Sequence, residues 1–416
     1  MRSGINSVPL GIEKIGLYAS RLKVDALRIA AARGRDVREV SEQVMVGERS
    51  VIPLCEDAIT MAVNAARPIV SDAHRGEIDL LIVCTESSVD FGKPLSTWVH
   101  RHLGLSPNCR NFEIKHACYG GTAGLRTAAA FVGSGATRGR KALVISTDFS
   151  RPALDTGVDF AGGGCAAAFL VGLDPQVLEI EIDKAGYWTN HVYDVFRPTA
   201  LAETGDNQLS LFSYLDALEG AFAHYETVNG EIDFDGSFRR HIYHAPFPGM
   251  AFQAHRTLLR RKANPDKRAV RASFDAKVAE GLYFARRLGA CYGASNFVCL
   301  CGLLGVPGDS AAAAGDRVSF FSYGSGCQSE FYGATVGPGA RESVQALQLD
   351  EHLDSRISVS VEGYEEIERL RERSIECPDF DPAQMDPGGV AEAAYRGTGL
   401  LVLRQVAGYR REYDQA

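Results

Sequence analysis

Continuous apolar runs alternate with amphipathic segments along the first half of the chain. The runs at 79–85 (DLLIVCT), 141–147 (KALVIST) and 166–172 (AAAFLVG) predict strands buried on both faces, because such strands show no polar alternation. Apolar residues recur at near-helical spacing over 55–66 and 93–104, which predicts helices there. Strands and helices in alternation are typical of a layered α/β fold.

The second half of the chain shows similar punctuation. Residues 173–188 (LDPQVLEIEIDKAGYW) predict an edge strand that leads into this half. Further helices are predicted over 209–228, from about 248, and over 274–290 and 295–305, with strands at 239–247, 317–326 and 398–414. No low-complexity linker interrupts the chain, so the sequence predicts two similar, closely packed halves, residues 1–174 and 175–416.

Composition and charge exclude several classes of function. No apolar run in the 416 residues approaches the ~20 residues of a membrane span. The opening MRSGINSVPLGIEKIG has no apolar signal core, so a cytoplasmic location is expected. The ten cysteines lack metal-ligand spacing and any CxxC pair, which predicts reduced thiols and no metal site. A net charge of −8 argues against nucleic acid as the main partner.

One cysteine stands where a strand-like run gives way to an alanine-rich helical pattern, in NFEIKHACYGGTAGLRTAAAF (111–131). The unpaired N–H groups of a helix N terminus favour the thiolate, so Cys118 is chemically suited to covalent acyl transfer. Gly120 and Gly121 would let a substrate carbonyl approach backbone N–H groups that stabilise an oxyanion. The alternative is a packed and inert thiol, because free cysteine is among the most buried residue types.

Five motifs follow one another in a distinctive order. They are GERSVIPLCEDAITMAVNAA (47–66), TESSVDFGKPLSTWVHRHLGL (85–105), FEIKHACYGGTAGL (112–125), HAPFPGM (244–250) and FFSYGSG (320–326). Together they resemble the 3-hydroxy-3-methylglutaryl-CoA synthases, members of the thiolase superfamily. The resemblance extends over nearly the whole chain and implies a thiolase-like fold with α-β-α-β-α layers, assembled as a homodimer.

The resemblance assigns three catalytic roles. Cys118 would take an acetyl group from a donor thioester, and Glu86 would remove a methyl proton so that a carbon nucleophile forms. His244 would hold and polarise the carbonyl of the acceptor. Period-two alternation places His241 and Tyr243 on the strand face opposite His244. The implied substrate-binding residues are Phe247, Ala290, Tyr323, Gly324 and Ser325.

Two branches of this family share the pattern. One makes 3-hydroxy-3-methylglutaryl-CoA in isoprenoid metabolism from free coenzyme A thioesters. The other installs β-branches in polyketides on substrates tethered to donor and acceptor acyl carrier proteins. Residues 86–105 and 203–222 look closer to the second branch. The phosphopantetheine arm would arrive on the carrier protein or as part of coenzyme A, with no separately bound cofactor.

A basic stretch follows the histidine motif, HRTLLRRKANPDKRAVR (255–271). Carrier proteins present an acidic helix beside their phosphopantetheine arm, so this stretch could dock one. The proposed docking residues are Arg256, Arg260, Arg261 and Lys262. The alternative is a solvated helix face.

The sequence departs from the family at one position. The family usually has Gly-Asn after the arginine-rich helix end, whereas RRLGACYGASNF places Ala290 where the asparagine would be. Loss of an amide that helps hold the acceptor could cost on the order of 10² to 10³ in rate. The alternatives to carrier-protein-dependent condensation are therefore the coenzyme A enzyme, an acyltransferase or thioesterase that has lost condensation, and a catalytically silent partner.

Overall fold

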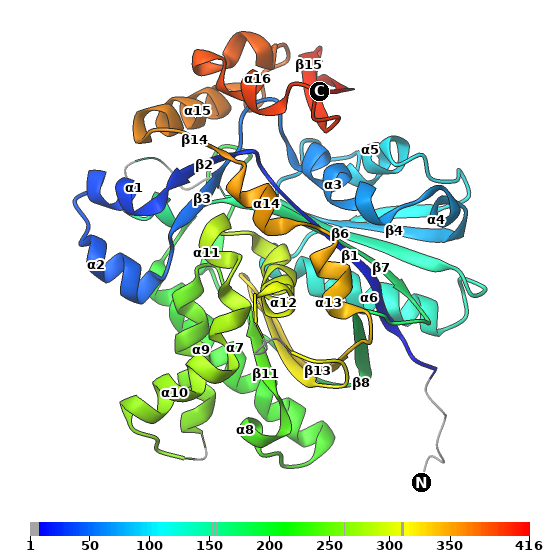
Figure 1. The fold of residues 1–416 in the computed structure, drawn as a ribbon, viewed down its shortest axis with the longest axis vertical. Helices are drawn as coiled ribbons and strands as arrows, with labels where there is room; N and C mark the ends of the chain where they lie inside the picture. The colour runs from blue at the N-terminus through cyan, green and yellow to red at the C-terminus, as the bar shows by residue number, and fades with distance from the viewer. Residues whose placement is uncertain (1–7, 151–153, 155, 262, 309–311) are drawn as a thin grey trace.

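The computed structural model describes residues 8–416, except 151–153, 155, 262 and 309–311. A nine-stranded sheet runs through the molecule in the order β11-β12-β13-β8-β1-β7-β6-β4-β5 (Figure 1). Its strands are β1 (Gly11–Ala19), β4 (Ile78–Cys84), β5 (Arg110–Ile114), β6 (Lys141–Phe149), β7 (Gly164–Gly172), β8 (Leu178–Thr189), β11 (Arg240–Tyr243), β12 (Arg317–Gly324) and β13 (Gln328–Val336).

Smaller sheets and many helices surround this central sheet. The remaining strands are β2 (Leu22–Asp25), β3 (Glu48–Val51), β9 (Val195–Phe196), β10 (Thr204–Gly205), β14 (Ile357–Ser358), β15 (Leu401–Ala407) and β16 (Arg410–Gln415). The α-helices are α1 (Ala26–Ala32), α2 (Val37–Glu39), α3 (Ala58–Ala66), α4 (Asp72–Glu77), α5 (Leu95–His102), α6 (Gly120–Gly133), α7 (Asn207–Asn229), α8 (Phe234–Ser237), α9 (Pro248–Arg260), α10 (Lys267–Lys277), α11 (Ala285–Leu288), α12 (Ser295–Gly305), α13 (Ala340–Gln345), α14 (Leu349–Asp354), α15 (Val361–Ser374) and α16 (Val390–Tyr395). No helix in the described ranges combines the length and apolar character that crossing a membrane requires.

The layers follow from side-chain alternation along the strands. In β4, Leu81 and Val83 join the core beneath α3 and α5, whereas Leu80 and Ile82 join the core that contains α6. Helix α12 meets this second core from the other half, where the ring of Phe297 lies 4.3 Å from that of Phe169 in β7. The long helix α7 packs along β8 and β13. The predicted layered α/β architecture is thus confirmed.

The two parts of the sheet join through a short contact. Strand β1 pairs along its length with β7, but it pairs with β8 at only two positions, Gly11 with Glu179 and Ile12 with Leu178. The prediction that 173–188 forms an edge strand is therefore wrong, because β8 lies between β1 and β13. Its polar alternation looked edge-like because most of the strand has a ladder partner only on the β13 side.

One predicted helix is broken. Residues 274–290 were expected to form a continuous helix, but α10 ends at Lys277, a 3-10 turn spans Ala279–Leu282, and α11 covers only Ala285–Leu288. Close packing against α12 explains the break, because a Cβ on Gly302 would lie 2.4 Å from the carbonyl oxygen of Gly281. Glycine at 281 also weakens a helix by ~1 kcal/mol relative to alanine. The other strands and helices named above form near their predicted ranges.

Candidate active site

Cys118 lies in a single 3-10 turn, Ala117–Tyr119, between the end of β5 and the start of α6. The preceding residue, Ala117, has φ of 40°, a left-handed conformation that costs a non-glycine residue roughly 1–3 kcal/mol. In this conformation the N–H of Ala117 donates a hydrogen bond to Oε1 of Glu86, 2.5 Å away. The strained turn therefore brings the predicted base beside the predicted nucleophile.

Gly121, the second glycine after Cys118, packs closely against another backbone segment. A Cβ on Gly121 would lie 2.3 Å from the carbonyl oxygen of Gly293, so this glycine permits two backbones to pack together. A Cβ on Gly293 would lie 3.3 Å from the carbonyl oxygen of Cys118. Gly121 therefore brings the segment 292–296 against the nucleophile turn. That the backbone after Cys118 also receives a substrate carbonyl stays a prediction.

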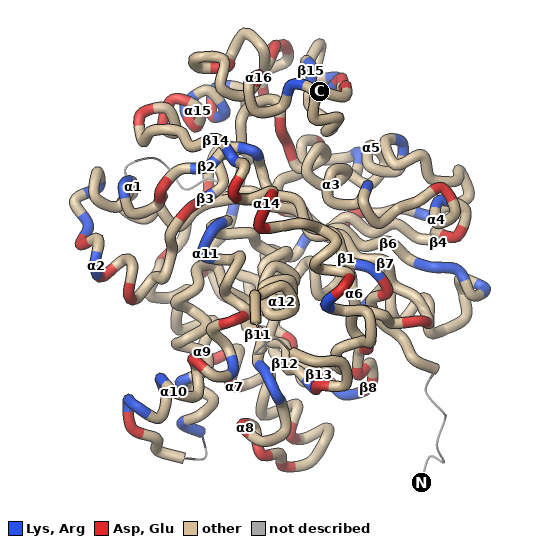
Figure 2. Tube along the Cα trace, in the orientation of Figure 1, with Lys and Arg blue, Asp and Glu red and all other residues tan. Residues whose placement is uncertain are grey.

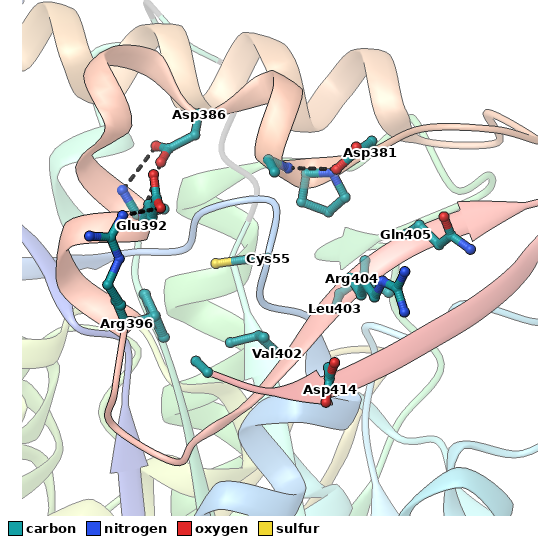
Figure 3. Close-up of a pocket in the computed structure, with 15 residues that line it drawn as sticks. Cys55, Asp381, Asp386, Glu392, Arg396, Val402, Leu403, Arg404, Gln405 and Asp414 are labelled. Carbon is teal, nitrogen blue, oxygen red and sulfur yellow. Dashed lines mark hydrogen bonds and ion pairs between the residues drawn. The ribbon is translucent and has the colours of Figure 1, made fainter.

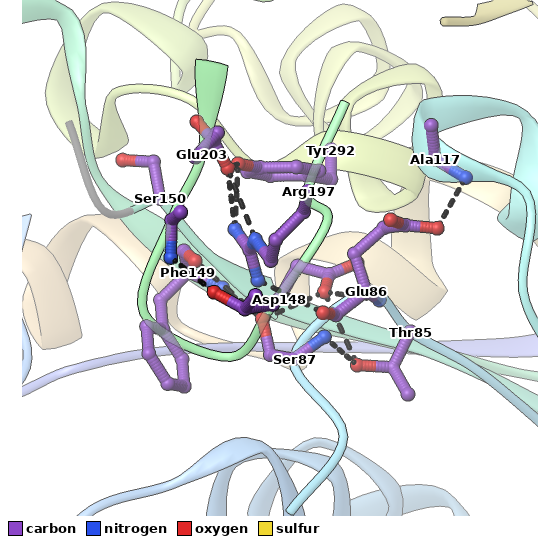
Figure 4. A network of polar contacts seen from close by, with 12 residues as sticks. Thr85, Glu86, Ser87, Ala117, Asp148, Phe149, Ser150, Arg197, Glu203 and Tyr292 are labelled. Carbon is purple, nitrogen blue, oxygen red and sulfur yellow. Dashed lines mark hydrogen bonds and ion pairs between the residues drawn. The ribbon is translucent and has the colours of Figure 1, made fainter. Parts of the chain in front are cut away.

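Three successive residues at the end of β4 converge on Asp148 of β6. The hydroxyl of Thr85, the backbone N–H of Glu86 and the hydroxyl of Ser87 donate to Oδ1 of Asp148 at 3.1, 2.7 and 2.9 Å (Figure 4). Parallel pairing of β4 with β6 aligns these segments. The backbone of Glu86 is thus fixed from beneath by a carboxyl group that is 1% exposed.

A second contact fixes Glu86 from above. Arg197 donates from Nη1 to the carbonyl oxygen of Glu86 at 2.9 Å, and its Nη2 lies 2.5 Å from Oε2 of Glu203 (Figure 4). The hydroxyl of Tyr292 donates to the same Glu203 oxygen at 3.1 Å. Tyr292 also has a positive φ, 45°. The segment that begins at Tyr292 is therefore tied to the loop that carries Glu86.

The electrostatics of this cluster disfavour negative charge. Burial, and then the Glu86 carboxylate, raise the pKa of Asp148 to about 8. Burial, and then Asp148 and Glu86, raise the pKa of the Cys118 thiol well above its usual value. The sequence predicted that the helix N terminus favours the thiolate, but burial and the two carboxyl groups raise the pKa of Cys118. The resting group is a thiol, because nearby carboxylates and burial outweigh the terminus.

His244 lies one residue beyond β11 in a dry environment. Its side chain is 1% exposed, and burial lowers its pKa to about 3, so the imidazole is neutral. Nδ1 lies 2.5 Å from the Ser295 hydroxyl oxygen, which also accepts a hydrogen bond from the N–H of Ala245 at 3.4 Å. When the Ser295 hydroxyl donates its proton to Nδ1, the imidazole hydrogen lies on Nε2.

The predicted alternation along β11 is confirmed. The rings of His241 and Tyr243 both lie close to that of His255, at 5.3 and 6.0 Å, whereas His244 contacts Ser295 of α12. His241 contacts the hydroxyl of Ser319 at 2.7 Å. His241 therefore belongs to a buried network on the far face of the strand.

The predicted glycine turn adjoins the nucleophile. A Cβ on Gly324 would lie 2.7 Å from the carbonyl oxygen of His116, so this backbone runs directly against the turn that carries Cys118. Tyr323 is buried and donates from its hydroxyl to Asp194, whose other oxygen accepts from the N–H of Gly326 at 2.9 Å. Ser325 is half-buried in the same turn. These predicted substrate-binding residues therefore lie at the site.

The other two predicted substrate-binding residues differ in placement. Ala290 is half-buried, and its N–H donates to the carbonyl oxygen of Ala161 at 3.0 Å. Ala290 lies two residues before Tyr292. It therefore adjoins the segment that contacts the Cys118 turn through Gly293 and His244 through Ser295. Phe247 is half-buried and packs against the hydrophobic cores, at the start of α9. It contributes to packing beside the histidine motif.

The basic stretch is less uniform than its sequence indicated. Figure 2 shows basic and acidic segments interspersed around α10. Arg260 is exposed and Arg256 half-buried, but Arg261 lies 3.2 Å from Glu226 and covers the ring of Phe222. Lys262 lies outside the described residues. Of the four predicted docking residues, Arg256 and Arg260 therefore have no ion-pair partner among the described side chains.

A separate cavity of about 500 Å³ lies between α16 and the β15–β16 hairpin, with Cys55 among its lining residues (Figure 3). None of the described candidate site residues lines it. Burial, and then Glu56, raise the pKa of Cys55 well above its usual value, so this thiol is protonated at neutral pH.

Comparison with known proteins decides the family. Residues 44–176 match the N-terminal part of hydroxymethylglutaryl-coenzyme A synthases, and 254–415 match their C-terminal part. The chain belongs to the hydroxymethylglutaryl-CoA synthase family. It is accordingly an acyltransferase that forms carbon–carbon bonds, and its fold is thiolase-like.

Several relatives cover most of the chain. The polyketide biosynthesis 3-hydroxy-3-methylglutaryl-ACP synthase PksG of Bacillus subtilis is 38% identical over 371 residues, 86% of this chain and 87% of that protein. The hydroxymethylglutaryl-CoA synthase of Enterococcus faecalis is 30% identical over 86% of this chain and 90% of its own length. The HMG synthase of the curacin biosynthetic pathway, solved in complex with holo donor-ACP, superposes with a TM-score of 0.92 at 35% identity, covering 98% of this chain and 100% of that one.

Sequence reasoning missed several polar residues at the site. Asp148, Asp194 and Arg197 gave no motif of their own, because they contact backbone groups that lie elsewhere in the chain. Glu203 opens the stretch 203–222 singled out above, but its contacts with Arg197 and Tyr292 were not predicted. One signal was available. Asp148 directly follows the apolar run KALVIST, and a carboxyl at the end of a buried strand must find donors there.

Proposed function

We propose that this chain condenses an acetyl-derived carbanion with a β-ketoacyl thioester held on an acyl carrier protein, and so installs a β-branch in polyketide biosynthesis. The observation that carries the proposal is the hydrogen bond from Ala117 to Glu86, which places a carboxylate beside the Cys118 turn. The higher identity to PksG than to the Enterococcus enzyme supports the carrier-protein branch.

The first step is acyl transfer. The Cys118 sulfur attacks the carbonyl carbon of the acetyl thioester, the bond to the phosphopantetheine sulfur breaks, and the departing thiolate receives the proton that Cys118 loses. Because Cys118 rests as a thiol, this proton must move as the carbon–sulfur bond forms. The product is acetyl-Cys118 and the free carrier thiol.

The second step forms the carbon–carbon bond. Glu86 takes a proton from the methyl group of acetyl-Cys118, and the resulting carbanion adds to the β-carbonyl carbon of the acceptor. That carbonyl oxygen becomes an alkoxide, which a hydrogen bond from Nε2–H of neutral His244 stabilises and which takes up the proton held by Glu86, so that the Glu86 carboxylate is regenerated. Water then hydrolyses the thioester to Cys118, leaving a carboxymethyl branch at a tertiary alcohol.

The two halves of the chain would share this chemistry. Glu86 and Cys118 come from the proposed half 1–174, and His244 and Tyr323 from the proposed half 175–416. The short β1–β8 contact at the sheet's midpoint supports that division. The ten free cysteines support a cytoplasmic location, where thiols stay reduced.

Partners follow from the same proposal. Donor and acceptor carrier proteins would deliver their phosphopantetheine arms, and Arg256 and Arg260 would contribute to docking. A homodimer would form through β5, the last strand of the sheet, which has β4 as its one ladder neighbour among the described residues. Phe112 on this edge is 38% exposed, which supports a covered edge.

A mass measurement tests the nucleophile. Incubation with acetyl-carrier protein should add one acetyl group to Cys118, and Cys118→Ala should remove the label entirely. A β-ketoacyl-carrier protein should then gain the mass of the branch, with free acetoacetyl-CoA turned over poorly. Label that persists on another cysteine in Cys118→Ala would exclude Cys118. Efficient turnover of the free coenzyme A thioesters would favour the isoprenoid enzyme.

Ala290 favours a second candidate function. If loss of the family amide abolished the aldol step, the chain would be an acyltransferase or thioesterase that retains Cys118 and His244. Normal acetyl loading without any branched product, over a panel of β-ketoacyl-carrier proteins, would support this second function.

A further inference from the structure

Two successive residues at the start of α12 hold His244 from different sides. The hydroxyl of Ser295 contacts the imidazole at Nδ1, as described above. Asn296, which is 1% exposed, donates from Nδ2 to the carbonyl oxygen of Phe321 at 2.9 Å. The same carbonyl oxygen accepts the backbone N–H of His244 at 2.7 Å. Ser295 therefore fixes the ring, and Asn296 fixes the backbone acceptor.

This carbonyl occupies the point where regular pairing ends. The parallel ladder between β11 and β12 finishes with Tyr243 opposite Phe321, and His244 lies one residue beyond it. The hydrogen bond to Phe321 therefore anchors the peptide of His244 to the sheet. On the other side, Tyr214 donates to the carbonyl oxygen of His244 at 2.8 Å. A shift of the Phe321 carbonyl would move the imidazole relative to Ser295.

An amide is a costly choice at this position. The helix sequence SNFVCLCGLLG is otherwise almost entirely apolar and buried. Oδ1 of Asn296 is buried with no hydrogen-bond partner among the described residues. An apolar side chain would avoid this desolvation cost. The amide is therefore explained by what its Nδ2 holds.

We propose that Asn296 is a positioning residue for condensation, acting through the Phe321 carbonyl on the backbone of His244. The inference rests on the proposed function of His244 as the group that polarises the acceptor. It assigns no contact between Asn296 and the substrate. Because the donor would reach Cys118 without His244, Asn296 should affect carbon–carbon bond formation and leave acetyl loading unchanged.

Two substitutions separate the hydrogen bond from the volume of the side chain. Asn296→Leu keeps a similar size and removes the donor, so kcat for condensation should fall about 10-fold, the effect of one lost hydrogen bond. KM for the acceptor and the acetyl-loading rate should stay within about twofold. Asn296→Asp keeps the shape and can donate only while its buried carboxyl is protonated. Its kcat should therefore approach that of the native chain at low pH and fall as pH rises.

A spectroscopic readout makes the test independent of activity. In protein labelled with ¹⁵N-histidine, the His244 ring signals are assigned by their loss in His244→Ala. They should shift in Asn296→Leu, because the contact of Nδ1 with Ser295 changes. Cys301→Ala, a buried substitution farther along α12, is the packing control and should leave the His244 signals and kcat unchanged.

The outcomes distinguish this inference from the function on which it rests. If His244→Ala condenses normally, the proposed role of His244 fails. If His244→Ala abolishes condensation but Asn296→Leu keeps native kcat and native His244 signals, the role of Asn296 is overturned. Should Asn296→Leu not fold, the pH profile of Asn296→Asp decides, and a profile parallel to that of the native chain contradicts the proposal.

Discussion

The two sides of the candidate site differ in the charge of the groups that surround them. Cys118 and Glu86 lie among charged groups, where Asp148, Arg197 and Glu203 contact the Glu86 loop or one another. His244 lies among uncharged groups, held by a serine hydroxyl and backbone atoms. The difference suits the two steps proposed, because proton removal needs an adjustable base, whereas polarising a carbonyl needs a rigid, neutral donor.

The same difference gives the two sides opposite responses to pH. Burial raises the pKa of Asp148 to about 8, but it lowers the pKa of His244 to about 3 and that of His255 to about 4. At neutral pH Asp148 is therefore largely protonated, and the two histidines are neutral. Lowering the pH protonates the buried histidines, whereas raising the pH deprotonates Asp148.

The largest expected effect is that of substituting Glu86, the base on the charged side. Glu86→Gln keeps the shape and can still accept from the N–H of Ala117 at its amide oxygen, but it cannot take a methyl proton. Acetyl loading of Cys118 should survive, while carbon–carbon bond formation falls at least roughly 10²-fold. Single-turnover assays that follow loading and branching separately provide the measurement. Equal loss in both steps would make Glu86 structural.

The substitution Asp148→Asn tests whether Asp148 causes the pH dependence of stability on the charged side. Because burial raises the pKa of Asp148 from its ordinary value of 3.8 to about 8, its contribution to stability is fully present below 3.8 and is lost progressively as pH rises from there to about 8. The asparagine stays neutral and can still accept at one oxygen. As pH rises from about 4 to 8, thermal unfolding midpoints should therefore fall by less, or rise by more, in the variant than in the native chain.

The two histidines contribute to stability over an overlapping range of pH, and their contribution is common to both chains. The depressed pKa of His244 and His255 gives a contribution that is present above the usual value of 6.5 and is lost as pH falls below it. Both histidines are kept in Asp148→Asn, so the difference in midpoint between the two chains isolates Asp148; it should change between about pH 4 and 8 and stay constant above that range. Curves that run parallel over the whole range would show that Asp148 is not the titrating group.

How far the sequence could predict this arrangement depends on the range of the interactions. Local apolar runs predicted β4, β6, β7 and α12, because burial on both faces leaves a local pattern. The motifs predicted the positions of Cys118 and His244. The contacts of Asp148 depend on pairing between β4 and β6, and those of Gly121 depend on the approach of Gly293. The residues next to each of them in the sequence therefore do not predict these contacts.

A smaller effect is expected at the basic stretch 255–271, which follows the histidine motif. Arg256→Glu with Arg260→Glu should raise KM for the carrier-protein substrate a few-fold and reduce its dependence on salt, because both charges are removed from the docking surface. A short pantetheine thioester should be used as before. Arg271→Glu is the matched control, since Arg271 already pairs with Asp275 at 2.8 Å. An equal rise in KM with the control would contradict docking at Arg256 and Arg260.

The smallest expected effect is at Ala290, between the two sides. Its backbone is pinned to Ala161, and the adjacent Gly289 packs so closely that a Cβ there would lie 1.9 Å from the carbonyl oxygen of Gly162. The direction of any side chain at 290 is therefore fixed, while the half-buried alanine leaves part of its surface open. An amide introduced here would be held in one orientation.

Ala290→Asn should raise condensation with acetoacetyl-carrier protein a few-fold. A positioned donor can contribute about 2.7–4 kcal/mol to the transition state, and overfilling the pocket costs ~1–3 kcal/mol, so a modest net gain is expected. The gain should be confined to branching, with acetyl loading of Cys118 unchanged. A variant that folds and loads normally, yet gains nothing with any β-ketothioester, would show that the acceptor side no longer performs the aldol step. The neutral pocket around His244 would then serve acyl transfer alone.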